Sequence, residues 1–201
     1  MPLPPACPSR QPKHRRSIAV QVFARDDGLW EVDATLVDTK TRDLPLGGGV
    51  RRAGDAIHDM LLRLVVDRGL NIVAAGSQTL AMPYVDQCAD HDDAYARLAG
   101  LNLARGFRRA LLDRVGGVRG CTHLTELAQV LPTAVIQAFA GEVIDARAEH
   151  PGAQRPFQID RCHALRAEGD VVRVHFPRWH RQPDANIGAD NAPSRAAPSP
   201  A

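Results

Sequence analysis

One stretch decides the fold: residues 58–67, which read HDMLLRLVVD. Apolar residues recur at every second position of this stretch, which is the period of a strand with one buried face. Four side chains would share that face: Met60, Leu62, Leu64 and Val66. Arg68-Gly69 predicts a turn, and residues 70–80 supply a second strand, so we expect an antiparallel pair.

A second hairpin is expected nearer the N-terminus. Residues 18–23 alternate, Asp26-Asp27-Gly28 is a turn signal, and residues 29–37 continue with apolar side chains among polar ones. Because strands that follow one another in sequence are usually neighbours in space, this hairpin should lie beside the pair at 58–80.

From Asp92 the apolar period changes from two to about 3.6. The pattern predicts helices over 92–99 and 103–115, and a third that starts near Cys121 and is divided or kinked at Pro132. A last strand is expected over 171–176. Strands followed by helices and one more strand indicate an α+β domain, with an antiparallel sheet of about four to five strands covered by three or four helices.

The chain has 201 residues, which suits one domain of ordinary size. Residues 1–16 and 179–201 are rich in Pro, Ala and charge without periodicity, and both are predicted to be disordered tails. The expected domain is therefore residues 17–178.

The balance of charge restricts the partners. The 25 basic and 23 acidic side chains leave a formal charge of +2, so no strong field would attract nucleic acid or an anionic membrane. Apolar runs are too short for a membrane helix, and the first 20 residues lack the apolar core of a secretory signal. We expect a cytoplasmic protein, for which a protein partner is the remaining candidate; the sequence does not predict its oligomeric state.

Most catalytic signatures are absent, including a Cys-x-x-Cys pair, HExxH, GxSxG and the glycine-rich nucleotide loops. The remaining candidate is the run GCTHLTEL at 120–127, because a thiol at a helix start ionises readily and can act as a nucleophile or a metal ligand. The simpler alternative is that Cys121 and His123 only begin a helix.

Cysteine and histidine pairs elsewhere suggest a metal site. Cys88 and His91 form a Cys-x-x-His half-site, and Cys121 with His123 would complete a set of two thiolates and two imidazoles if the two loops meet. Cys162, beside His163, is a further ligand candidate. Such soft donors favour zinc or an iron–sulfur cluster as cofactor. His58, between acidic neighbours, could be a ligand or a catalytic base, although such a histidine is more often on the surface.

Five ordered blocks resemble a bacterial family with a domain of unknown function, whose marker is the GCTHL run. The blocks are DGLWEVDATLVDTK, AGDAIHDMLLRLVVD, PYVDQCADHDDAYARLAGL, GCTHLTEL and CHALRAEGDVVRVHFPRW. The resemblance covers residues 14–178 and implies that certain residues are not incidental: Asp38, His58, Asp59, Cys88, Cys121, His123 and Cys162.

A weaker resemblance, at the level of fold, is to iron–sulfur scaffold proteins of the NifU and IscU type. Their small sheet leads to a loop cysteine, two helices separated by glycine, and a later cysteine beside a histidine, and the chain follows that order with Cys88, Gly100 and Cys121. It lacks the scaffold's middle cysteine. Its histidine also follows the last cysteine by two residues instead of preceding it.

Three functions follow from these observations. The first is a metal-binding or iron–sulfur accessory module with ligands from Cys88, His91, Cys121, His123 and Cys162. The second is a thiol-dependent enzyme with Cys121 as nucleophile and His123 or His58 as base, which would need a non-helical backbone at Cys121. The third is a non-catalytic protein-interaction domain.

Overall fold

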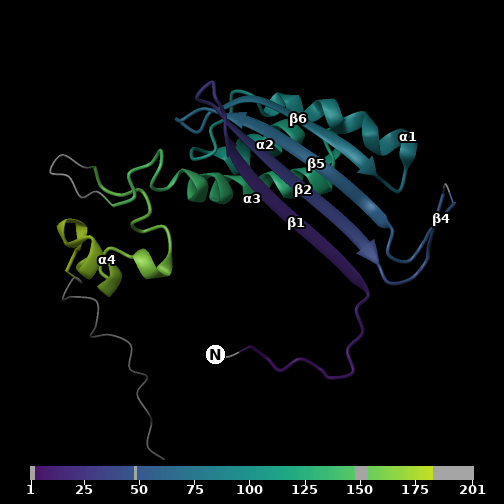
Figure 1. The fold of residues 1–201 in the computed structure, drawn as a ribbon, viewed down its shortest axis with the longest axis horizontal. Helices are drawn as coiled ribbons and strands as arrows, with labels where there is room; N and C mark the ends of the chain where they lie inside the picture. The colour runs from purple at the N-terminus through teal and green to yellow at the C-terminus, as the bar shows by residue number, and fades with distance from the viewer. Residues whose placement is uncertain (1–2, 48, 148–153, 183–201) are drawn as a thin grey trace, which may run out of the picture. The chain divides into compact units, whose positions relative to one another are not determined.

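A computed structural model describes residues 3–47, 49–147 and 154–182, without the side chains of residues 86 and 89–92. The chain divides into two compact units, Met1–Phe139 and Ala140–Ala201. Each unit is described by itself below, and Figure 1 gives the labels of the helices and strands.

The first unit is built on a four-stranded antiparallel sheet in the order β1-β2-β5-β6. The strands are β1 (His14–Ala24), β2 (Trp30–Lys40), β5 (Ala56–Val66) and β6 (Ile72–Ala81). A separate small hairpin, β3 (Leu44–Leu46) with β4 (Gly49–Arg51), lies between β2 and β5 in sequence. Both predicted hairpins are confirmed, and β2 pairs with β5 as expected.

One face of this sheet, the inner face, is buried beneath helices, and Figure 1 shows α2 and α3 behind the sheet. The alternation read in the sequence is responsible, because Met60, Leu62, Leu64 and Val66 are almost fully buried. The same face of β2 carries Val32, Ala34 and Leu36, each without exposed surface. The prediction of an α+β fold is therefore confirmed.

The helices of this unit are α1 (Val85–Cys88), α2 (Phe107–Val115) and α3 (Thr122–Phe139), with 3₁₀ segments η1 (Ala89–Leu98) and η2 (Gly117–Arg119). The apolar stripe predicted for the third helix lies against the sheet: Leu124, Leu127, Leu131, Val135 and Phe139 are all buried. Pro132 lies inside α3 without dividing it into two helices.

Two helix predictions need correction. The segment expected to be an α-helix over 92–99 is the 3₁₀ helix η1, and α2 begins at Phe107 instead of Leu103. The side chain of Asn102 instead forms a turn, since it accepts a hydrogen bond from Ala104 N and donates one to Gly69 O. Gly106, at φ 63°, then provides the left-handed residue from which α2 starts.

The second unit has a small core of Ile159, Ala167 and Val172. Its elements are η3 (His163–Leu165), α4 (Asp170–His175) and η4 (Pro177–Trp179). The strand predicted over 171–176 is wrong, since α4 occupies residues 170–175. The six residues of α4 are too few to distinguish the two periods, and only Val172 is buried while Val174 is 59% exposed.

A single domain was predicted over 17–178, and the contacts within the chain form two compact units that divide after Phe139. The single domain stays a prediction. Strand β1 begins at His14, inside the N-terminal tail predicted over 1–16. Most of the tail predicted over 179–201 falls outside the described residues, from 183 onward. Among the helices that the structure describes, none is long and apolar enough to cross a membrane.

Candidate functional site

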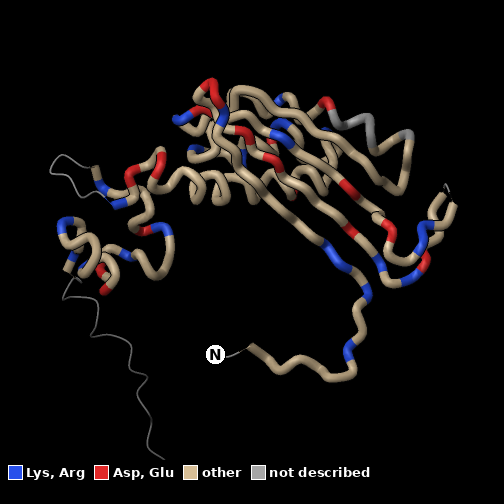
Figure 2. The backbone as a smooth tube through the Cα atoms, viewed as in Figure 1, with Lys and Arg blue, Asp and Glu red and all other residues tan. Residues whose placement is uncertain are grey.

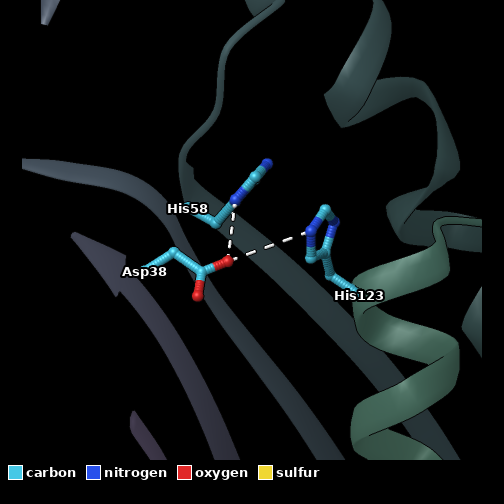
Figure 3. Close-up of side chains that lie close together, drawn as sticks. All are labelled: Asp38, His58 and His123. Atoms are coloured by element: carbon cyan, nitrogen blue, oxygen red, sulfur yellow. Dashed lines mark hydrogen bonds and ion pairs between the residues drawn. The ribbon is translucent and has the colours of Figure 1, made fainter. Parts of the chain in front are cut away.

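A row of polar residues crosses the inner face at one end of the sheet. Asp38 pairs directly with Arg16 of β1 and with His58 of β5, and directly opposed residues in antiparallel strands point to the same face. The first turn of α3 adds His123 above this row. Figure 3 shows that His58 and His123 both point toward the same oxygen of the Asp38 carboxylate. The elements of the first unit thus bring together residues more than 80 positions apart.

Asp38 is the centre of this cluster and is only 2% exposed. Its Oδ1 accepts hydrogen bonds from Arg16 Nε at 2.9 Å and His14 Nε2 at 3.1 Å. Its Oδ2 accepts from Arg16 Nη2 at 2.8 Å and His58 Nδ1 at 3.0 Å, and lies 3.9 Å from His123 Nε2. An ionised carboxylate can only accept, so His58 carries its proton on Nδ1 in this arrangement.

Arg16 compensates the buried charge. Burial raises the pKa of Asp38, but the hydrogen bonds and charge of Arg16, followed by those of His58, outweigh burial and lower the pKa to about 2. The same hydrogen bonds raise the pKa of Arg16. Arg16 Nη1 also donates to Glu126 Oε2 at 2.6 Å, which ties β1 to α3 above the site. The carboxylate is therefore ionised at neutral pH.

The two histidine rings stack against each other, with centroids 3.9 Å apart and planes inclined by 33°. Burial lowers the pKa of His123, and the nearby charges of His58 and Arg16 lower it further. Two protonated rings at this distance would repel, so at least one is neutral and offers a lone pair at neutral pH.

This donor set fits a metal ion. Asp38, His58 and His123 each offer one ligand atom, and these atoms lie within 4.8 Å of one another. Two imidazoles and one carboxylate suit zinc, iron(II) and related divalent transition metals better than calcium or magnesium. The hydrogen bonds from Arg16 and His14 would orient the carboxylate from behind, as second partners of metal ligands do.

Cys121 lies at the edge of the cluster. It immediately precedes α3, and its Sγ is 3.8 Å from His123 Nδ1, while His123 Nε2 faces Asp38. The backbone at Cys121 is outside the helix, which is the condition that the thiol-enzyme hypothesis required. The hydroxyl of Tyr95 fixes this backbone through hydrogen bonds with both the N–H and the carbonyl of Cys121.

A comparison with protein-family models identifies residues 14–137 as a match to the family described as protein of unknown function (DUF2889). The chain belongs to the DUF2889 family. The match covers most of the first unit, including every residue of the cluster, but it does not identify GCTHL as the family's marker. No curated protein and no solved structure gave a significant match, so the resemblance to iron–sulfur scaffolds gains no support from them.

The other predicted ligands are placed elsewhere or are not placed. Within the described residues, the group that could hold a metal contains no cysteine. Cys88 is half-buried at the end of α1, the side chain of His91 lies outside the described part, and Cys162 is an exposed thiol of the second unit. The contribution of these three residues to a site stays a prediction.

Asp38 was pointed out by the family resemblance without being assigned a role, and Arg16 was missed. A signal for Asp38 exists in the sequence. It continues the alternation of Val32, Ala34 and Leu36, so a carboxylate was predictable on a buried face, where charged groups need a partner. Arg16 gives no comparable signal, because its role depends on the register between β1 and β2.

Proposed function

We propose that this DUF2889 protein binds a divalent transition metal through Asp38, His58 and His123. One observation carries the proposal: β2, β5 and α3 each contribute one ligand atom, and the three atoms lie within 4.8 Å of one another. One of them belongs to the buried carboxylate of Asp38. A buried charge and two stacked imidazoles are costly to assemble for stability alone. A metal ion would use all three side chains at once.

The chemistry of the three donors limits what the metal could be. Three protein ligands leave coordination positions for water or a substrate, as in catalytic rather than structural zinc sites. A bound metal would supply a Lewis acid at those positions. The described cluster lacks the thiolates that an iron–sulfur centre requires, so the iron–sulfur form of the accessory-module hypothesis has less support than an N/O-ligated ion.

If His58 Nδ1 becomes the ligand, the proton that it donates to Asp38 would have to move to Nε2 of the same ring. Because an imidazolium must lose a proton before it can bind a metal, binding would be weaker at low pH. Arg16 would remain bonded to Asp38, which lowers the negative charge available to the metal and favours a moderate affinity.

The test begins with the full chain, purified without a histidine tag and analysed for bound metals, then titrated with Zn²⁺ and Co²⁺ by calorimetry. We expect one ion per chain and weaker binding at low pH. His58→Ala and His123→Ala should each weaken binding by more than about tenfold, whereas His175→Ala in the second unit is the matched control and should leave it unchanged.

The Co²⁺ spectrum separates the two kinds of ligand set. Nitrogen and oxygen ligands give no thiolate charge-transfer band, and Cys88→Ser and Cys121→Ser should bind as the unmodified protein does. No stoichiometric binding of either ion would refute the proposal. A strong thiolate band lost on Cys121→Ser would replace it with a cysteine-ligated site.

The contact between Cys121 and His123 favours a second candidate function, thiol-dependent catalysis. In that arrangement His123 would take the thiol proton at Nδ1 while its Nε2 faces Asp38, an order of groups used by cysteine nucleophiles. Alkylation at neutral pH tests it. Cys121 should react faster than the half-buried Cys88 and should lose this advantage in His123→Gln; equal rates for the two thiols would exclude an activated nucleophile.

A further inference from the structure

Strand β1 leaves one long edge of the sheet without a partner. It pairs with β2 from His14 to Ala24 without a shift in register, but within the described residues no backbone hydrogen bond joins its other side to a further strand. The opposite edge of the sheet is different at the start of β6. There Ile72 N–H donates to Leu101 O and Ile72 O accepts from Gly100 N–H. Just before β6, Leu70 O accepts from Leu103 N–H. The β6 edge is therefore occupied at its start, whereas the described β1 edge is open along its whole length.

The edge also lacks the features that usually prevent pairing between chains. β1 contains no proline and no lysine, and its register with β2 has no bulge, unlike the registers of β5 with its two neighbours. Its residues 17–24 are uncharged, and Ile18 and Phe23 are 40% and 44% exposed. An exposed edge with this composition is favourable for a β-strand partner.

The distribution of charge indicates that this partner is a second copy. Figure 2 shows basic residues at the start of β1 and an uncharged strand after it. The turn that follows carries Asp26 and Asp27, of which Asp27 also pairs with Arg25. Antiparallel self-pairing would bring the basic start, His14 to Arg16, beside the acidic turn Asp26-Asp27 of the other copy, and the reverse at the other end. A parallel arrangement would place like charges together.

We propose that the protein forms a symmetric dimer in which β1 pairs antiparallel with β1 of a second copy, with Gln21 at the two-fold axis. Inner-face residues must oppose inner-face residues, so the sum of the two paired residue numbers is even. A sum of 42 is the register that brings Arg15 and Arg16 opposite Asp27 and Asp26. This register also opposes Val20 to Val22 and Phe23 to Ala19. Each apolar side chain then meets an apolar neighbour.

Cross-linking tests the register in the full-length protein. Cys7 and Cys162 are exposed and are first replaced by Ser to remove unspecific cross-links. In that background Gln21→Cys should form a disulfide-linked dimer under mild oxidation by diamide. The matched control is Gln78→Cys, which is also exposed but lies on β6 at the other side of the sheet, and it should stay monomeric on a denaturing gel.

Analytical ultracentrifugation tests the assembly without a cross-link. The expected mass is twice the 21.8 kDa of one chain, and Gln21→Lys should raise the dissociation constant at least tenfold because two ammonium groups meet at the axis. Gln78→Lys should not change it. A mass of one chain at all concentrations would overturn the proposal, and so would a dimer that tolerates Gln21→Lys and gives no Gln21→Cys cross-link.

Discussion

Asp38 carries a charge although it is almost fully buried, and hydrogen bonds from its neighbours offset the cost of removing that charge from water. Arg16 approaches with two nitrogens, and His14 and His58 add one bond each. Such an arrangement is strong only while it is complete, because removing one partner leaves a charge in a poorly solvated site. The stability of this end of the sheet therefore depends on one carboxylate.

Asp38→Asn is expected to lower the free energy of unfolding by about 2 kcal/mol, since Arg16 loses its buried charged partner and keeps only the exposed Glu126. Urea denaturation of the metal-free protein measures the change. The matched control is Asp33→Asn on the same strand, where the more exposed pair with Arg63 should contribute less than about 1 kcal/mol. Equal effects of the two substitutions would show that burial of Asp38 has no special cost.

Sequence reasoning found only part of the site at the residue scale. His58 and His123 were singled out by their residue type and neighbours, and they do lie together. Their contact with Asp38 depends on the pairing of β2 with β5 and on the placement of α3, which periodicity alone does not give. The cysteines were predicted as ligands because thiolates bind soft metals. The described atoms that lie within 4.8 Å of one another are instead a carboxylate oxygen and two imidazole nitrogens.

The turn between β5 and β6 is an element whose geometry depends on one side chain. Asp67 Oδ1 accepts hydrogen bonds from the backbone N–H groups of Gly69 and Asn71, and the Asn71 side chain donates to Oδ2 at 2.9 Å. These bonds allow Leu70 to take a left-handed conformation, at φ 66°, with its side chain in the core. The hydrogen bond from the Asn71 side chain is the main cause that lowers the pKa of Asp67.

Asp67→Ala should therefore destabilise the protein by about 1 kcal/mol at pH 7, through loss of these hydrogen bonds. The folded pKa lies below the ordinary 3.8, so this stabilisation is present above about pH 4 and is lost as the pH falls through the folded pKa. Thermal unfolding at pH 7 and pH 3 should show a smaller difference at pH 3. In Asp67→Asn, which cannot titrate, the effect of acid on this turn should vanish; a larger Asp67→Ala effect in acid would contradict the mechanism.

Elements with a long apolar period were predictable and short ones were not. The four long strands and α3 repeat their pattern over ten or more residues, which is enough to distinguish a period of two from 3.6. α4 has only six residues. η1 contains the polar residues 90–93, which have no apolar side chain from which a period could be read. For these segments tertiary contacts decided the backbone.

At the scale of the whole molecule, the DUF2889 match and the first compact unit nearly coincide, since one ends at residue 137 and the other at Phe139. The core of the first unit and all candidate metal ligands lie within this range. The second unit has its own small core. This division indicates that the first unit contains what is needed for folding and for the proposed metal site.

A chain that ends at Glu142 should accordingly fold and bind Zn²⁺ with an affinity within about twofold of the full chain. Circular dichroism, cooperative thermal unfolding and calorimetry check this expectation. The control is the same truncation carrying His123→Ala, which should fold but bind weakly. A truncated chain that fails to unfold cooperatively would show that residues 143–201 contribute to the stability of the first unit.

The bridge from Arg16 to Asp38 and Glu126 joins one of the earliest segments of the chain to one made 110 residues later. During synthesis the four strands of the sheet can leave the ribosome and pair before His123 and Glu126 of α3 have been made. Capture of an ion would then come last, once the polypeptide is long enough. Measuring the zinc affinity of nascent chains of increasing length would show at which length the first unit completes its folding.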